Sequence, residues 1–231
     1  MAGRVGQRIQ VRAVLFDLFE TLVTESHSTP TRAGSLGPAL GLDAAAFKIE
    51  WKARRPLVTL GRLSFAEALT EISRVLTGSA NEDAIRRACE QRLREKAIPF
   101  ERPDPGVEQM IRELRARNIR LGAISNCFAE GVHAWSTWPL AREFECRGFS
   151  CEAGLAKPDP EIYKKAMREL EVEPATTVYV GDGGDDELAG AERAGLRAFR
   201  AAWFTGSAPS SLDYPALSTC NEALTTIVRE R

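Results

Sequence analysis

Three short apolar runs, each ending at a polar cluster, constrain the fold of this chain more than any other feature of its sequence. The runs span residues 11–16, 119–124 and 177–180. A brief apolar run that stops at turn residues is typical of a buried strand. Helical patterns separate the later runs, and strands that alternate with helices form a parallel sheet with right-handed crossovers. The sequence therefore predicts an α/β fold built on a parallel sheet.

The stretch between the first and second runs contains no strand pattern. Residues 26–42 are rich in Ser, Thr, Pro and Gly, which favours an irregular segment with at most a short helix. Helical patterns follow at residues 43–55 and 81–95. Between them, apolar residues at helical spacing begin directly after Ser64, which is a suitable N-cap. We interpret this block as an inserted all-helical domain.

The pattern changes again after residue 103, where helices alternate with strands. Apolar residues at helical spacing predict a helix over 107–114, and a further short strand is predicted at 196–199. We therefore assign residues 1–22 together with 101–231 to a core domain. Residues 23–100 form the predicted helical domain.

The composition excludes several classes of partner. Lys and Arg number 31 against 32 Asp and Glu, so the formal net charge of −1 argues against binding to nucleic acid or to an anionic membrane. No apolar stretch approaches the ~18 residues of a membrane-spanning helix, and none resembles a signal peptide. The five cysteines contain no C-x-x-C pair, which favours reduced thiols. We expect a cytoplasmic protein, either a monomer or a homodimer.

Polar side chains gather where three of the predicted strands end. Asp17 and Thr21 follow the first strand, Ser125 and Asn126 follow the second, and an acidic segment at 182–187 follows the third. In open α/β sheets, ligands bind at the carboxyl ends of the strands. Carboxylates can form covalent acyl-phosphate intermediates, and acidic oxygens beside a substrate phosphate suit Mg²⁺. Together these clusters predict a metal-assisted site with a carboxylate nucleophile.

Four ordered segments resemble the motifs of a known family. They are F-D-L-F-E-T-L at 16–22, S-N at 125–126, K-P-D-P at 157–160 and V-G-D-G-G-D-D-E at 180–187. These segments are similar to the four motifs of the haloacid dehalogenase-like (HAD) hydrolase superfamily. The resemblance covers the chain from about residue 11 to residue 200. It implies a Rossmann-like core with an all-helical cap domain inserted after the first motif, which agrees with the helical block.

The resemblance also implies roles for individual residues. Asp17 would be the catalytic nucleophile, and Thr21 would brace its loop. Ser125 and Asn126 would bind the substrate, with Ser125 hydrogen-bonded to the transferred group. Lys157 would neutralise charge between the nucleophile and a small anionic substrate, an electrostatic role that strengthens as water is excluded.

A Mg²⁺ site is implied by the same resemblance. Asp17 and Asp182 would hold the ion, together with the main-chain carbonyl of Phe19. The second acidic partner in the fourth motif is either Asp186 or Glu187. The residues that follow, L-A-G-A, align better with Glu187.

One position departs from the pattern of phosphatases in this family. Two residues after the nucleophile they carry a second Asp, which protonates the leaving group, and this chain has Phe19 there. Phe cannot transfer a proton, and a positioned acid or base contributes roughly 10²–10⁴ in rate. Glu20 is adjacent, but on an extended backbone its side chain is expected to point to the opposite face.

The departure leaves two further interpretations open. Haloacid dehalogenases of the family also lack the second Asp and carry an aromatic residue there, and Tyr163 matches a tyrosine found in dehalogenases or simply packs in the core. Four carboxylates between Asp182 and Glu187 instead favour a cation-dependent phosphatase. The leading hypothesis is a Mg²⁺-dependent phosphatase that acts on a small phosphorylated metabolite. The alternatives are a metal-independent 2-haloacid dehalogenase and a non-catalytic binding protein.

Basic residues gather in the first helix of the predicted cap and the turn that follows it. They either reach an anionic substrate when the cap closes and excludes water, or form solvated faces of amphipathic helices. These residues are Lys52, Arg54, Arg55 and Arg62, with Trp51 beside them.

Overall fold

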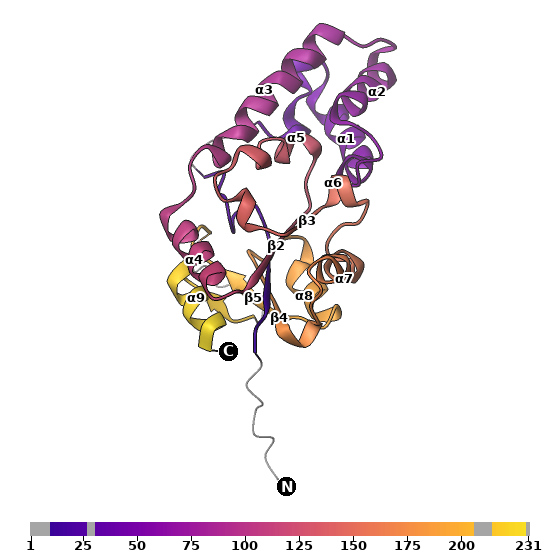
Figure 1. The fold of residues 1–231 in the computed structure, drawn as a ribbon. Helices are drawn as coiled ribbons and strands as arrows, with labels where there is room; N and C mark the ends of the chain where they lie inside the picture. Colours follow the sequence, from indigo (N-terminus) through magenta and orange to yellow (C-terminus); the bar gives the residue numbers. More distant parts are fainter. Residues whose placement is uncertain (1–9, 27–30, 206–213, 230–231) are drawn as a thin grey trace.

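The computed structural model describes residues 10–26, 31–205 and 214–229, and its centre is a six-stranded sheet (Figure 1). The strands lie in the order β3-β2-β1-β4-β5-β6, and every neighbouring pair is parallel. This confirms the predicted Rossmann-like α/β fold. The strands are β1 (Ala13–Phe16), β2 (Arg120–Ser125), β3 (Cys146–Phe149), β4 (Thr177–Gly181), β5 (Arg197–Ala201) and β6 (Ala216–Leu217). The two-residue β6 is too short to leave a periodic signal, and the sequence did not predict it.

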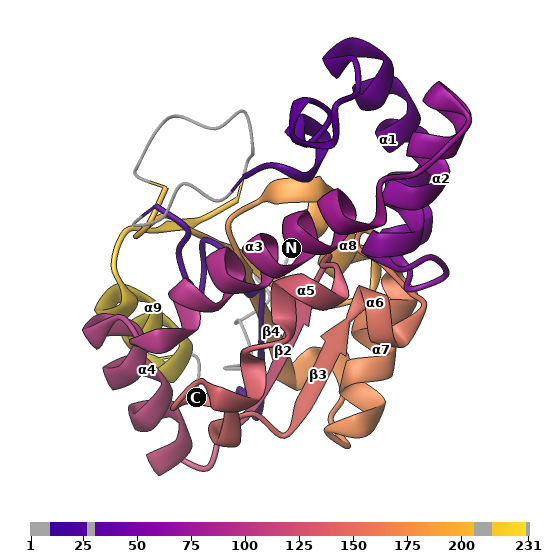
Figure 2. The same ribbon diagram turned by 90° about the horizontal axis from the view of Figure 1, so that it is seen from above.

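Helices cover both faces of the sheet (Figure 2). Helices α4 (Pro105–Ala116) and α9 (Cys220–Arg229) cover one face, and α7 (Pro160–Glu169) and α8 (Glu187–Arg193) cover the other. Successive residues of β1 point to opposite faces, as the pleat requires. Two of the four strand residues pack on the α4 side and the other two on the α7 side, so β1 is buried on both faces and reads as a continuous apolar run.

The stretch between β1 and β2 is helical, as predicted. It contains α1 (Ala44–Thr59), α2 (Phe65–Thr77) and α3 (Glu82–Glu101), and we refer to these three helices as the helical block. The block lies beyond the carboxyl ends of the strands (Figure 1). It packs around its own buried cluster, which includes Phe47 and Leu69 and is separate from the two clusters that flank the sheet.

Helix boundaries in the block follow local chemistry. Ser64 caps α2 in a full capping box, since its hydroxyl accepts from the Glu67 amide and the Glu67 carboxylate accepts from the Ser64 amide. Helix α1 continues about one turn past its predicted end at residue 55 and runs through Pro56 to Thr59. The irregular segment predicted at 26–42 holds two 3₁₀ turns, at Ala33–Ser35 and Pro38–Leu40, while its residues 27–30 lie outside the described part of the chain.

Short elements complete the connections between the strands. The turn after α1 approaches the core at Gly61, whose φ is +66°. A Cβ at this position would lie 1.9 Å from the Cys151 carbonyl oxygen, so a side chain does not fit.

None of the helices in the described part of the chain has the length and the hydropathy of a membrane-spanning segment. The remaining helical pieces are α5 (Ala129–Val132), α6 (Ser150–Ala153), and 3₁₀ turns at Trp135–Thr137, Ala141–Glu143, Pro174–Thr176 and Gly184–Asp186.

Candidate active site

The site is built where the strand order of the sheet reverses. Strands β1 and β4 are neighbours in the middle of the sheet, and the chain leaves them in opposite lateral directions. Such a switch point opens a crevice at the carboxyl ends of the strands. Asp17 directly follows β1, and its amide donates to the carbonyl of Val180 in β4 at 2.8 Å. Asp182 directly follows β4, so the sheet itself brings two predicted site residues together.

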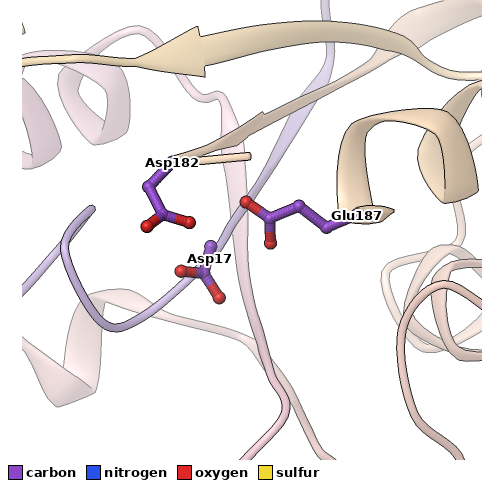
Figure 3. A group of neighbouring side chains, drawn as sticks. All are labelled: Asp17, Asp182 and Glu187. Atoms are coloured by element: carbon purple, nitrogen blue, oxygen red, sulfur yellow. The ribbon is translucent and has the colours of Figure 1, made fainter. Parts of the chain in front are cut away.

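Three carboxylates converge in this crevice (Figure 3). Asp17, Asp182 and Glu187 each offer an oxygen, and the three oxygens lie within 4.8 Å of one another. Asp17 and Glu187 are 5% and 1% exposed, while Asp182 is partly exposed. Glu187 is held in place because Tyr179 donates its hydroxyl proton to Oε2 at 2.6 Å and the Gly183 amide donates to Oε1 at 2.9 Å.

Lys157 connects two of the three carboxylates. Its ammonium group donates to Asp17 Oδ1 and to Glu187 Oε2, and the side chain is buried. The Lys157 main chain is fixed by Asn126, whose Oδ1 accepts from the Lys157 amide and whose Nδ2 donates to the Lys157 carbonyl, both at 2.8 Å. Asn126 therefore positions Lys157, a role that the sequence did not predict for it.

Burial and charge shift the pKa values of this cluster. Burial, reinforced by the charge of Glu187, raises the pKa of Asp17 to about 8. Burial also raises the pKa of Asp182. Burial lowers the pKa of Lys157, but the carboxylates of Asp17 and Glu187 outweigh that effect and raise the pKa overall.

The charge balance of the cluster fits a divalent cation. With all groups ionised, the three carboxylates and the single ammonium of Lys157 leave a formal charge of −2 in a largely buried space. Hard cations such as Mg²⁺ bind through carboxylate oxygens, and uncompensated buried carboxylates are costly. The residues present therefore suit Mg²⁺ in ligand type and in charge.

The structure distinguishes the two acidic candidates of the fourth motif. Glu187 lies in the carboxylate cluster, whereas Asp186 is exposed and outside it. Asp185 and Asp186 both adopt the left-handed backbone conformation, with φ of +51° and +52°. This turn carries Asp186 away from the crevice and begins α8 at Glu187, which faces inward.

Phe19 and Glu20 lie in the turn that follows Asp17. The Phe19 ring packs edge-on against Phe100 at 6.4 Å, so no proton donor occupies this position. The expectation of an extended backbone at Glu20 is wrong, because its φ is +57°. Its carboxylate accepts from the Thr24 hydroxyl at 2.9 Å and the Glu25 amide at 2.8 Å, so it stabilises its own turn.

Two predicted hydroxyl residues are buried beside the strand ends. Thr21 is fully buried, and its hydroxyl has no hydrogen-bond partner within the described residues, so no bracing hydrogen bond is formed there. The Thr21 carbonyl instead accepts from Trp203 Nε1 at 2.9 Å. Ser125 ends β2 and is buried, at the level of the sheet where Asp17 and Asp182 also emerge.

Two tyrosines donate hydrogen bonds to Glu187 of the carboxylate cluster. Tyr163 donates its hydroxyl proton to the Glu187 carbonyl at 2.7 Å, and its ring packs edge-on against Tyr179 at 5.2 Å. Tyr163 thus combines core packing with a contact to the site's main chain. Tyr179 was not predicted as a site residue. The available signal was a lone phenol within an otherwise aliphatic buried strand, since a buried hydroxyl needs a polar partner.

A cavity of about 750 Å³ lies between the site and the helical block. Its wall includes Phe19, Asn126 and Lys157 from the sheet side. Lys52 and Arg55 of α1 line it from the block. This volume lies within the usual range for small-molecule sites.

The fold and the site together define a parallel α/β protein with a buried aspartate and lysine at the switch point of its sheet. The family model described as haloacid dehalogenase-like hydrolase matches residues 11–195, and the chain belongs to this family. This confirms the resemblance seen in the four motifs.

Individual relatives carry the names of different hydrolases. A glyceraldehyde 3-phosphate phosphatase of Methanopyrus kandleri is 36% identical over 98 residues, a match that spans 41% of each chain. A phosphoglycolate phosphatase of Nitrosospira multiformis is 29% identical and covers 83% of each chain. The crystal structure of a 2-haloacid dehalogenase from Pseudomonas syringae pv. Tomato DC3000 superposes with a TM-score of 0.67 at 22% identity, covering 95% of this chain and 98% of that one. At this identity the structural likeness concerns the fold alone.

Proposed function

We propose that this hydrolase is a Mg²⁺-dependent phosphatase that acts on a small phosphorylated metabolite. The observation that carries the proposal is the cluster of Asp17, Asp182 and Glu187, in which Asp17 and Glu187 are buried and whose charge Lys157 balances only in part. A metal-independent hydrolase has no need for two further carboxylates beside the nucleophile. The phosphatase names of relatives that match this chain support the same conclusion.

In this proposal Asp17 is the nucleophile, and one of its carboxylate oxygens attacks the phosphorus of the substrate. Lys157 holds Asp17 in position and offsets the charge that gathers between nucleophile and phosphate. Ser125 donates its hydroxyl to the transferred group. Asp17, Asp182, Glu187 and the Phe19 carbonyl would hold Mg²⁺, which supplies positive charge to the phosphoryl oxygens when it is bound.

Residues 23–100 act as a cap in this proposal, with residues 1–22 and 101–231 as the catalytic core. The cavity between them, which Lys157 and Lys52 line, would hold the substrate. The boundary falls near the end of α3, which runs to Glu101.

The lack of an acid at Phe19 limits which leaving groups the proposed reaction can expel efficiently. Without an acid at this position, an alkoxide must leave unprotonated, whereas an aryloxide leaves readily. We therefore expect much faster hydrolysis of aryl phosphates than of alkyl phosphates.

The test is phosphate release from 4-nitrophenyl phosphate and from alkyl phosphates, with Mg²⁺ and with a chelator. We expect Mg²⁺-dependent release, strongest on the aryl ester. Release that persists unchanged in chelator would contradict the metal dependence. No release from any ester would contradict the phosphatase assignment and favour a binding protein.

A second candidate function is a metal-independent 2-haloacid dehalogenase. Phe19 beside the cavity favours it, because halide leaves without protonation. Lys157 would then serve alone as the counter-charge of Asp17. Halide release from 2-chloropropionate in the presence of chelator would support this candidate, and its absence would exclude that substrate.

A further inference from the structure

Two cations on the cavity wall lack acidic partners in the described part of the chain. Lys52 and Arg55 lie one helical turn apart on α1, both are exposed, and both line the cavity. Their neighbour Arg54 is ion-paired with Glu50 and with Glu71, the latter at 3.0 Å. Arg54 thus uses the acidic side chains next to this helix, whereas no described acid forms an ion pair with Lys52 or Arg55.

The other cations that line this cavity are all paired. Arg92 contacts Glu130 at 2.8 Å and lies over the ring of Phe128, and Lys96 forms an ion pair with Glu25. Lys157 is occupied by the carboxylate cluster. Lys52 and Arg55 thus differ from their neighbours, because their charge remains available to a molecule in the cavity.

The cavity links these two cations to the reaction centre. The same continuous space is lined by Lys157 near the carboxylate cluster and by Lys52 and Arg55 on α1. Phe19 and Phe128 also line this space and offer apolar contacts. A ligand whose reacting phosphate lies near Asp17 can therefore extend a second group towards α1.

We propose that Lys52 and Arg55 bind a second anionic group of the substrate. The inference rests on the proposed phosphatase function and narrows it to phosphomonoesters that also carry a carboxylate or a second phosphate. Arg55 offers a planar fork of donors that matches either group, and Lys52 adds a compact positive charge. Phe19 and Phe128 offer apolar contacts to the short carbon skeleton between the two anionic groups.

Three acids line the cavity, and the two that are not paired with Lys96 provide the competing explanation. Asp185 and Asp186 also line the cavity, and Asp185 accepts a hydrogen bond from Asn126 at 3.0 Å. If Lys52 and Arg55 serve only to attract this acidic turn, their removal changes hydrolysis of all substrates alike. If they bind the substrate, their removal affects only substrates with the second anionic group.

The experiment compares matched substrates. 3-Phosphoglycerate and glycerol 3-phosphate share a skeleton and differ by one carboxylate. Propane-1,3-diol bisphosphate and the corresponding monophosphate differ by one phosphate. We expect the wild-type protein to favour the member with the second anion by about tenfold or more in kcat/KM, since charge-assisted hydrogen bonds are strong. The preferred pair identifies the anion as carboxylate or phosphate.

The double variant Lys52→Gln with Arg55→Gln is expected to lose this preference, mainly through KM. Its kcat/KM for 3-phosphoglycerate should fall about tenfold or more, and its kcat/KM for glycerol 3-phosphate far less. The matched control is Lys48→Gln with Arg74→Gln, which removes the same charge from exposed positions of the helical block outside the cavity. The control should keep the preference.

Each outcome decides between the explanations. Equal kcat/KM within both pairs in the wild-type protein, or a preference that survives in the double variant, would overturn the proposal. If the wild-type protein hydrolyses no ester, the phosphatase function fails. Binding of the same compounds, measured by calorimetric titration, then still tests the anion site. Wild-type protein should bind 3-phosphoglycerate more tightly than glycerol 3-phosphate, and the double variant should not.

Discussion

The charged side chains at the sheet are paired with one another, whereas those of α1 that line the cavity are unpaired in the part of the chain that the structure describes. At the sheet, Asp17, Glu187 and Lys157 are buried and linked by hydrogen bonds. On α1, Lys52 and Arg55 are exposed and free of partners within the described residues. Fixed dipoles and charges suit a reaction centre, which must be organised before substrate arrives. Unpaired cations suit recognition, because their interaction energy is gained only when a ligand of the right charge binds.

One cavity thus combines catalytic groups that are fixed by hydrogen bonds with cations that remain available to bind the substrate. Substitutions at the sheet end should change turnover of every substrate. Substitutions on α1 should change only which substrates bind well.

The largest effect is expected from Asp17→Asn, which removes the proposed nucleophile. Turnover of all phosphomonoesters should fall by at least about 10³-fold, because no other described carboxylate can replace Asp17 at the end of β1. Asn has nearly the same shape as Asp, and Lys157 keeps its ion pair with Glu187, so the variant should remain folded. Phosphate release and a thermal melt check both points. Unchanged turnover would assign the chemistry to another residue.

Phe19→Asp should produce the next largest effect, and in the opposite direction. A carboxyl group at this position can protonate the leaving group, so hydrolysis of alkyl phosphates should rise about tenfold or more. Aryl phosphates should change little, because their leaving group needs no proton. Phe19→Leu is the control, since it removes the ring that packs on Phe100 without adding an acid. An equal response of both variants would show that the lost ring, rather than the acid, matters.

Glu187→Gln and Asp186→Asn form a matched pair that tests the carboxylate cluster. The buried Glu187 contributes to the cluster, so its neutralisation should raise the Mg²⁺ concentration for half-maximal activity by about tenfold or more. Asp186 is exposed and outside the cluster, so its variant should stay close to wild type. The measurement is activity across a Mg²⁺ titration. A larger effect at Asp186 would reverse the assignment of the second acidic partner.

Tyr163→Phe should have the smallest effect. It removes a buried hydroxyl that donates to the Glu187 carbonyl at 2.7 Å, and the free energy of unfolding should fall by about 1 kcal/mol. Tyr214→Phe is the control, because its hydroxyl bonds an exposed partner, Glu192. Urea denaturation measures both. A loss of turnover far beyond this change in stability would instead place Tyr163 in the chemistry, as the dehalogenase alternative requires.

Much of the fold could be predicted because strong local patterns coincide with it. Short apolar runs predicted the central strands, and Ser64 with the spacing after it predicted α2. The element that was missed, β6, has only two residues and depends on pairing with β5 rather than on its own pattern. Helix α1 extends past its predicted end because Val58, which lies beyond Pro56, is buried in the block, and this packing outweighs the cost of a proline inside the helix.

The candidate site was predictable to the extent that strand ends determine it. Asp17, Ser125 and Asp182 each follow a predicted strand, and parallel strands bring their carboxyl ends to one edge. The contacts of Asn126 were not predictable, because they join two loops that are 31 residues apart. Tyr179 was missed for the same reason, since its partner Glu187 belongs to the next helix.

The sequence by itself determined the order of the elements, the positions of the polar clusters and the family. These follow from local periodicity and from short motifs, which each segment carries alone. The tertiary structure decided which neighbouring residues face the site. Glu187 rather than Asp186 joins the cluster because a left-handed turn precedes α8, and Arg55 rather than Arg54 faces the cavity because of how α1 packs. Such choices depend on backbone torsions and on contacts between distant segments, which no local pattern encodes.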